Sequence, residues 1–127
     1  MSPTATLSEK DAAAIRRLTD VHLKAVLDHD PEAFLKTCTD DIHFFPPDQP
    51  AVSGRDACRA YLADFPTPKT FTAKVRDVEG EGDLAYSRGD ATATFDDGTE
   101  TTFTWLAIVR RQRDGSWKMA RDMWVTP

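Results

Sequence analysis

The spacing of the apolar residues changes once along the chain, and this change constrains the fold more than any other feature. Up to about residue 65 apolar side chains recur every three or four residues, and from Phe71 onward they alternate with polar ones. The first spacing is typical of helices that bury one face, and the second of half-buried strands. Helices followed by a run of strands predict an α+β fold in which the helices pack on one antiparallel sheet.

Local signals divide the first half into three helices. Ser8 followed by Asp11 resembles a capping box and starts the first helix. Pro31 disfavours helical geometry at Asp30 and suits the first turn of a new helix. We therefore expect helices over 8–28, 31–37 and 54–65, with a short extended run over 41–45.

The second half predicts four long strands joined by Gly- and Asp-rich turns, over about 70–79, 83–95, 100–112 and 116–125. The third of these carries apolar residues on both faces, with Trp105 on one and Leu106 on the other. An antiparallel strand that is apolar on both faces needs cover on both. The helices can cover one face. A second copy of the chain, forming a homodimer through the sheet, or other segments of the same chain would cover the other.

Composition excludes several classes of protein. The 127 residues contain 16 Lys and Arg against 21 Asp and Glu, so the net charge of −5 argues against a nucleic-acid partner. No stretch approaches the roughly 18 apolar residues of a membrane span, and the start lacks a secretory signal. Cys38, Cys58 and the three histidines lack metal-ligand spacing, so we expect no metal. These features predict one cytoplasmic domain over 1–127, with residues 1–7 flexible.

The order of elements resembles the nuclear transport factor 2-like superfamily, and the local sequence is most similar to its SnoaL-like branch, also described as the DUF4440 or ketosteroid isomerase-related group. Four segments carry the resemblance: 29–34, 39–47, 52–57 and 114–124. The resemblance implies an α+β, cystatin-like cone in which three N-terminal helices pack on a curved antiparallel sheet around a pocket. Members of the superfamily include isomerases, cyclases and dehydratases, and also non-catalytic binding or dimerisation modules.

Two side chains are candidates for acid–base chemistry in such a pocket. His22 lies between Leu18 and Val26 on the apolar side of the first helix and should face inward, as a catalytic group or as a hydrogen-bonded core histidine. Asp122 should share one face of the last strand with Lys118, Ala120 and Trp124.

If that face is the concave one, burial would raise the pKa of Asp122 toward neutrality, which suits a general acid or base. The resemblance points the same way, because SnoaL-like cyclases place an acidic residue on a late strand. The alternative for Asp122 is an ion pair with Arg88 or Arg110 on a neighbouring strand.

Aromatic and imidazole side chains would complete the ligand site. We expect the lining to include His43, Phe45, Tyr86, Trp105 and Trp124. Two features of ketosteroid isomerases are missing: the place of their aspartate falls at Phe45 or Pro46, and the first helix contains no tyrosine.

Two functions therefore remain open. The first is a cofactor-free isomerase or cyclase acting on a hydrophobic carbonyl compound, with Asp122 as acid or base and His22 or His43 as hydrogen-bond donor to the oxygen where charge develops. The second is a ligand-binding or dimerisation module of the same fold without chemistry.

Overall fold

The structure, a computed structural model, describes residues 7–126 and contains the three expected helices. They are α1 (Glu9–Leu27), α2 (Pro31–Leu35) and α3 (Arg55–Asp64). The Ser8 hydroxyl accepts a hydrogen bond from the backbone N–H of Asp11, which confirms the capping signal. Residues 1–6 of the N-terminal segment that we expected to be flexible lie outside the described residues, and Leu7 packs against the core. Within the described part, no helix is long and apolar enough to cross a membrane.

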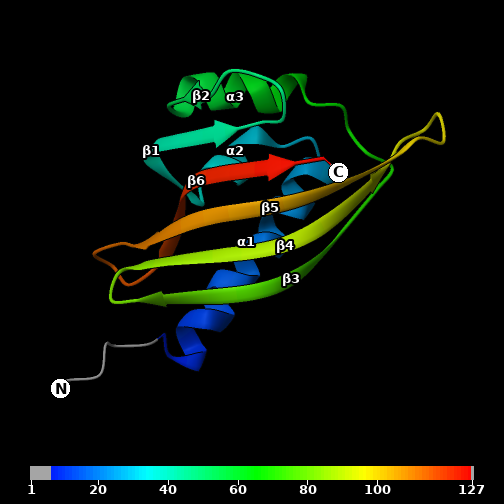
Figure 1. Cartoon of the computed structure of the whole chain (residues 1–127). Helices are drawn as coiled ribbons and strands as arrows, with labels where there is room; N and C mark the ends of the chain where they lie inside the picture. The colour runs from blue at the N-terminus through cyan, green and yellow to red at the C-terminus, as the bar shows by residue number, and fades with distance from the viewer. Residues whose placement is uncertain (1–6, 127) are drawn as a thin grey trace.

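Six strands form one curved sheet in the order β2-β1-β6-β5-β4-β3 (Figure 1). Their bounds are β1 (Cys38–Phe45), β2 (Val52–Ser53), β3 (Thr70–Glu81), β4 (Leu84–Thr94), β5 (Glu100–Arg111) and β6 (Trp117–Val125). The α+β class and the long meander β3 to β6 are as predicted. One pair departs from the antiparallel arrangement, because β6 returns beside β1 in the same direction. A parallel pair needs a long connection, and here α3 and the strands β3 to β5 provide it, so that β6 starts at the same end of the sheet as β1.

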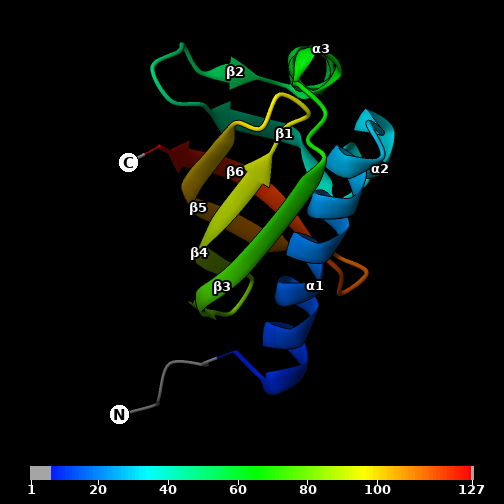
Figure 2. The ribbon, with the colours of Figure 1, turned by 90° about the vertical axis from the view of Figure 1, so that its right-hand side faces the viewer.

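Helix α1 lies along the concave face of the sheet, and α3 sits over its β1 end (Figure 2). The first turn of α1 is held to the end of β5 by Arg111, whose guanidinium donates hydrogen bonds of 2.9 and 2.7 Å to Asp11. The same guanidinium lies 4.7 Å from the Trp117 ring centroid, and the indole N–H also donates to Asp11. These hydrogen bonds, led by that of Arg111, lower the pKa of the Asp11 carboxyl.

The concave face of β4 is built from small side chains, which leave space between the sheet and the helix. Its buried positions are Ala85, Ser87, Gly89, Ala91 and Ala93. Gly89 is paired with Trp105 on β5, and a Cβ at Gly89 would overlap the Trp105 indole and the carbonyl oxygen of Lys74. The absence of a side chain at Gly89 therefore allows Trp105 to lie flat against the sheet.

A β-bulge in β6 changes which of its residues face the helix. Ile108 is paired with Arg121 but the next residue, Val109, is paired with Met119, so Ala120 is the extra residue. Strict alternation would put Met119 and Asp122 on opposite faces. The bulge brings both to the concave side. Lys118 pairs with Arg110 on the outer face, so the expectation that it shares a face with Asp122 is wrong.

Substituting Gly89→Ala should destabilise the protein by about 1–3 kcal/mol, because the added methyl group must displace Trp105 or the β3 backbone. Urea denaturation followed by circular dichroism measures the loss. The control is Thr92→Ala, on the same strand but the opposite face. An equal loss for both variants would contradict the packing argument.

Candidate acid–base pocket

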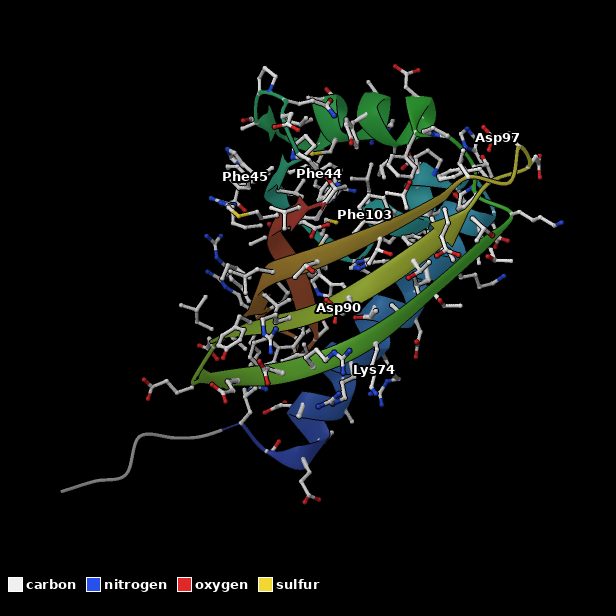
Figure 3. The ribbon with its side chains drawn as sticks, turned by 45° about the vertical axis from the view of Figure 1, so that its right-hand side comes forward. Phe44, Phe45, Lys74, Asp90, Asp97 and Phe103 are labelled. Atoms are coloured by element: carbon white, nitrogen blue, oxygen red, sulfur yellow. The ribbon has the colours of Figure 1, made fainter. Side chains whose placement is uncertain are left out.

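A cavity of about 130 Å³ lies between α1, α3 and the concave face of the sheet. Eight of the eighteen residues that line it are aromatic, and Figure 3 labels two of them, Phe44 on β1 and Phe103 on β5. Phe44, Tyr61 and Trp124 pack edge to face, with each pair of ring centroids 5.9 Å apart. An apolar cavity of about 150 Å³ can accept benzene, so this cavity has room for about one ring.

Four of the residues predicted for the site line this cavity: His22, Trp105, Asp122 and Trp124. Three others do not, and the prediction that they line it is corrected: His43, Phe45 and Tyr86 lie on the opposite face of the sheet. The Tyr86 hydroxyl instead donates to Glu79, and the Nδ1 atom of His43 lies 2.8 Å from the carbonyl oxygen of Asp41.

The cause is the alternation of side chains along β1 and β4. Phe44 is buried and points into the cavity, so its neighbour Phe45, also labelled in Figure 3, must face away from it. Aromatic residues occupy both faces of β1, so the sequence pattern does not distinguish the face that lines the cavity.

Several lining residues were not predicted. Tyr61 reaches the cavity from α3, and Phe34 reaches it from α2. The sequence does contain a signal for the cavity. Small residues alternate along β4 from Ala85 to Ala93, and side chains of this size cannot fill the space between a sheet and a helix. The contribution of α3 has no such signal, since its position over the sheet depends on distant contacts.

His22 is held by one hydrogen bond and one stacking contact. Its Nε2 atom lies 2.6 Å from the Thr37 hydroxyl oxygen, and its ring stacks on Phe34 with centroids 4.3 Å apart. Burial among these groups lowers the pKa of His22 to about 4, because the low-dielectric surroundings disfavour the imidazolium. His22 is therefore neutral at physiological pH.

Asp122 is placed by β6 between Phe44 on β1 and Ala107 on β5. The alternative that it pairs with Arg88 or Arg110 is wrong: Arg88 binds Asp77 at 2.7 Å and Arg110 binds Asp41 at 2.9 Å, both on the outer face. Among residues 7–126, Asp122 has neither an ion-pair nor a hydrogen-bond partner. Its burial raises the pKa of the carboxyl to about 7.

Burial thus inverts the usual order of the two groups. A free carboxyl loses its proton well below the pH at which a free imidazole does, whereas here the pKa of Asp122 lies above that of His22. Between about pH 4 and 7 the pocket holds a neutral acid and a neutral base instead of an ion pair. Such separation of pKa values is characteristic of acid–base sites.

No group of three or more His, Cys, Asp or Glu side chains that could hold a metal ion occurs in the described part of the chain. The two cysteines are buried as free thiols. Burial raises the pKa of Cys38 to about 12 and that of Cys58 to about 11, so neither is a reactive thiolate near neutral pH.

In the comparison with protein families, residues 16–120 match the model of the SnoaL-like domain. No curated protein matches the chain in sequence.

Solved structures resemble the chain closely in fold. A ketosteroid isomerase-like protein from Erwinia carotovora atroseptica has a TM-score of 0.82 and 24% identity, covering 94% of this chain and 98% of that one. An NTF2-like protein of unknown function from Pseudomonas putida has a TM-score of 0.80 and 22% identity, covering 95% and 89%. A protein of unknown function with a cystatin-like fold from Nostoc punctiforme has a TM-score of 0.82 and 16% identity, covering 95% and 94%. At these identities the likeness establishes the cystatin-like fold.

The inverted pKa values predict opposite effects of pH on stability. Between about pH 4 and 7 the folded protein holds a proton on Asp122 that the unfolded chain has lost, so this contribution to stability falls as pH rises. Between about pH 4 and 6.5 the unfolded chain holds a proton on His22 that the folded protein lacks, so that contribution rises with pH. The two slopes, each up to about 1.4 kcal/mol per pH unit, should nearly cancel in the wild type.

Substitution should separate the two contributions. Relative to the wild type, the free energy of unfolding of Asp122→Asn should rise from pH 4 to 7, and that of His22→Phe should fall from pH 4 to 6.5. Urea denaturation at a series of pH values measures both differences. A difference for Asp122→Asn that does not vary with pH would mean that the folded-state pKa of Asp122 is not raised.

Proposed function

The chain belongs to the SnoaL-like domain family, and we propose that its pocket carries out cofactor-free proton transfer on a small hydrophobic carbonyl compound, as an isomerase or cyclase does. Asp122 is the group that accepts and returns the proton, from a carbon next to the carbonyl. The observation that carries the proposal is a carboxyl without an ion-pair or hydrogen-bond partner among the described residues, set in an aromatic cavity with a pKa of about 7.

The position of Asp122 favours chemistry over structure. A carboxyl that serves packing or stability is normally paired, because an unpaired buried polar group costs free energy. Near neutral pH, Asp122 is present in both protonation states, which is the condition under which one carboxyl can take up a proton and give it back. The largely apolar wall would hold a flat ring against the Phe44, Tyr61 and Trp124 side chains.

Hydrogen exchange tests this chemistry without knowledge of the natural substrate. Cyclohexanone, a one-ring ketone, is incubated with the protein in D₂O, and loss of the proton signal next to the carbonyl is followed by NMR. The wild type should accelerate exchange, and Asp122→Asn should lower the rate by about 100-fold or more. The rate should rise with pH and level off above the Asp122 pKa of about 7, because the carboxylate is the base.

Asp90→Asn is the matched control, since it makes the same change on the outer face of β4, where Figure 3 labels Asp90. Asp90 binds Arg76 there at 2.9 Å. It should leave the exchange rate unchanged. Equal rates for the wild type and Asp122→Asn would refute the proposed role of Asp122.

A non-catalytic binding module is the second candidate. It is favoured by the lack of the ketosteroid isomerase residues noted above and by the predominance of apolar side chains in the cavity wall. Ring compounds that bind to the wild type without any accelerated exchange would favour this candidate.

We further propose that the outer face of the sheet pairs with a second copy of the chain. Leu106 and Met123 are paired across β5 and β6, and are 41% and 46% exposed. Val125 nearby is 52% exposed, and Phe45 adjoins Met123 from β1. A contiguous apolar patch on an otherwise charged surface is typical of a protein–protein contact.

A lysine in this patch should prevent association. Met123→Lys should convert a dimer to a monomer, as measured by light scattering coupled to size-exclusion chromatography, because the ammonium would lie unpaired in an apolar contact. Thr72→Lys, on the edge strand β3, is the control and should remain dimeric. A wild-type protein that is monomeric at high concentration would contradict the proposal.

A further inference from the structure

A single hydroxyl proton fixes the hydrogen-bonding direction of His22. The Thr37 hydroxyl oxygen lies 2.8 Å from the carbonyl oxygen of Phe34 and 2.6 Å from the Nε2 atom of His22. A carbonyl oxygen can only accept, so the Thr37 proton must be donated to Phe34. The Thr37 oxygen then accepts from His22, whose Nε2 atom must carry the ring proton. The reverse arrangement would leave two oxygen lone pairs facing each other at 2.8 Å.

The assignment is reinforced by how Thr37 is anchored. Its backbone carbonyl accepts a hydrogen bond of 2.8 Å from the N–H of Met119 on β6, and its hydroxyl closes onto the last turn of α2 at Phe34. The acceptor for His22 is therefore held by two elements that do not belong to α1.

The other ring nitrogen of His22, Nδ1, consequently has a free lone pair. It has no hydrogen-bond partner among residues 7–126. In every buried or half-buried one of these residues, each side-chain nitrogen or oxygen that solvent cannot reach has a hydrogen-bond partner. The unpaired Nδ1 atom must therefore be accessible to a molecule the size of water. His22 lines the cavity, and an Nδ1 atom that faces the cavity would offer a bound ligand a hydrogen-bond acceptor.

This direction revises the role that the sequence suggested for His22. A neutral ring whose only N–H is donated to Thr37 has no proton to offer to a developing oxyanion. The group that it recognises must itself be a donor.

We propose that the pocket selects the enol or phenol form of a one-ring ligand, with the ligand hydroxyl donating a hydrogen bond to Nδ1 of His22. The inference rests on the proposed function: the Asp122 carboxylate removes a proton from the carbon next to the carbonyl to give an enolate, and return of that proton to the oxygen gives the enol. A ketone in the same position would direct its oxygen lone pairs at the lone pair of Nδ1. The cavity of about 130 Å³ and its flat aromatic walls favour a planar ring of this kind.

Binding of three one-ring probes tests the direction of the hydrogen bond. Phenol is a permanent enol with a hydroxyl donor, anisole is its methyl ether and can only accept, and cyclohexanone is the corresponding ketone. Calorimetric titration should show that His22→Phe, which keeps a ring against Phe34, weakens phenol binding by about three- to tenfold. The same variant should change anisole and cyclohexanone binding by less than about twofold.

His43→Phe makes the same substitution on the outer face of the sheet and should leave the affinity of all three probes unchanged. An equal loss of affinity for phenol and anisole in His22→Phe would overturn the proposal, since it would mean that the ring serves packing alone.

Nitrogen NMR of the wild type keeps the inference testable even if the variants fold poorly. At pH 7 the Nδ1 resonance of His22 should lie in the range of an unprotonated imidazole nitrogen and should shift toward the protonated range when phenol is added, but not with anisole. Thr37→Val should allow the proton to populate both ring nitrogens. A protonated Nδ1 in the free wild-type protein would refute the inference.

These outcomes are separable from those of the exchange assay. Accelerated exchange without discrimination between phenol and anisole leaves the proposed function intact and refutes this inference. Discrimination between phenol and anisole without accelerated exchange supports this inference and refutes the proposed function.

Discussion

The structure depends on the contact between α1 and the concave face of the sheet, whose side chains on β4 are too small to fill the space beneath the helix. From Ala85 to Ala93 every inward residue of β4 is small, and Gly89 has no side chain because Trp105 occupies its place. The bidentate pair of Arg111 and Asp11 holds the first turn of α1 to the sheet at one end. The cavity forms toward the other end, where aromatic rings from several elements form its wall.

The pKa values of the two ionisable groups in the cavity follow from the same lack of large and polar side chains. The cavity is lined mainly by aromatic and aliphatic side chains, which provide no counter-ion and little polar solvation for Asp122 and His22. Both Asp122 and His22 therefore favour their neutral forms, and their pKa values cross. The small side chains that leave the cavity open thus also leave the Asp122 carboxyl without a partner, and its burial raises its pKa toward neutrality.

The two faces of the sheet have separate roles. Charged partners such as Arg88 and Asp77, or Arg110 and Asp41, are confined to the outer face, so none of them neutralises Asp122. The bulge at Ala120 is what separates Asp122 from these partners, because it turns Met119 and Asp122 toward the same side of β6. Without the extra residue, the alternation that leads from the buried Trp117 and Met119 would put Asp122 on the outer face.

The sequence by itself determined the order of the helices and of every strand except the two-residue β2, the turns of the meander and the inward direction of His22. All of these depend on local spacing and on residues close in the chain. The sequence also predicted Asp122, Trp105 and Trp124 as a group. Only the tertiary structure decided that Phe44 faces the cavity while His43, Phe45 and Tyr86 face away, that β6 runs parallel to β1, and that the Thr37 hydroxyl lies beside Nε2 of His22. These features depend on contacts between residues far apart in the sequence and on a one-residue bulge, neither of which alters the apolar pattern of the chain.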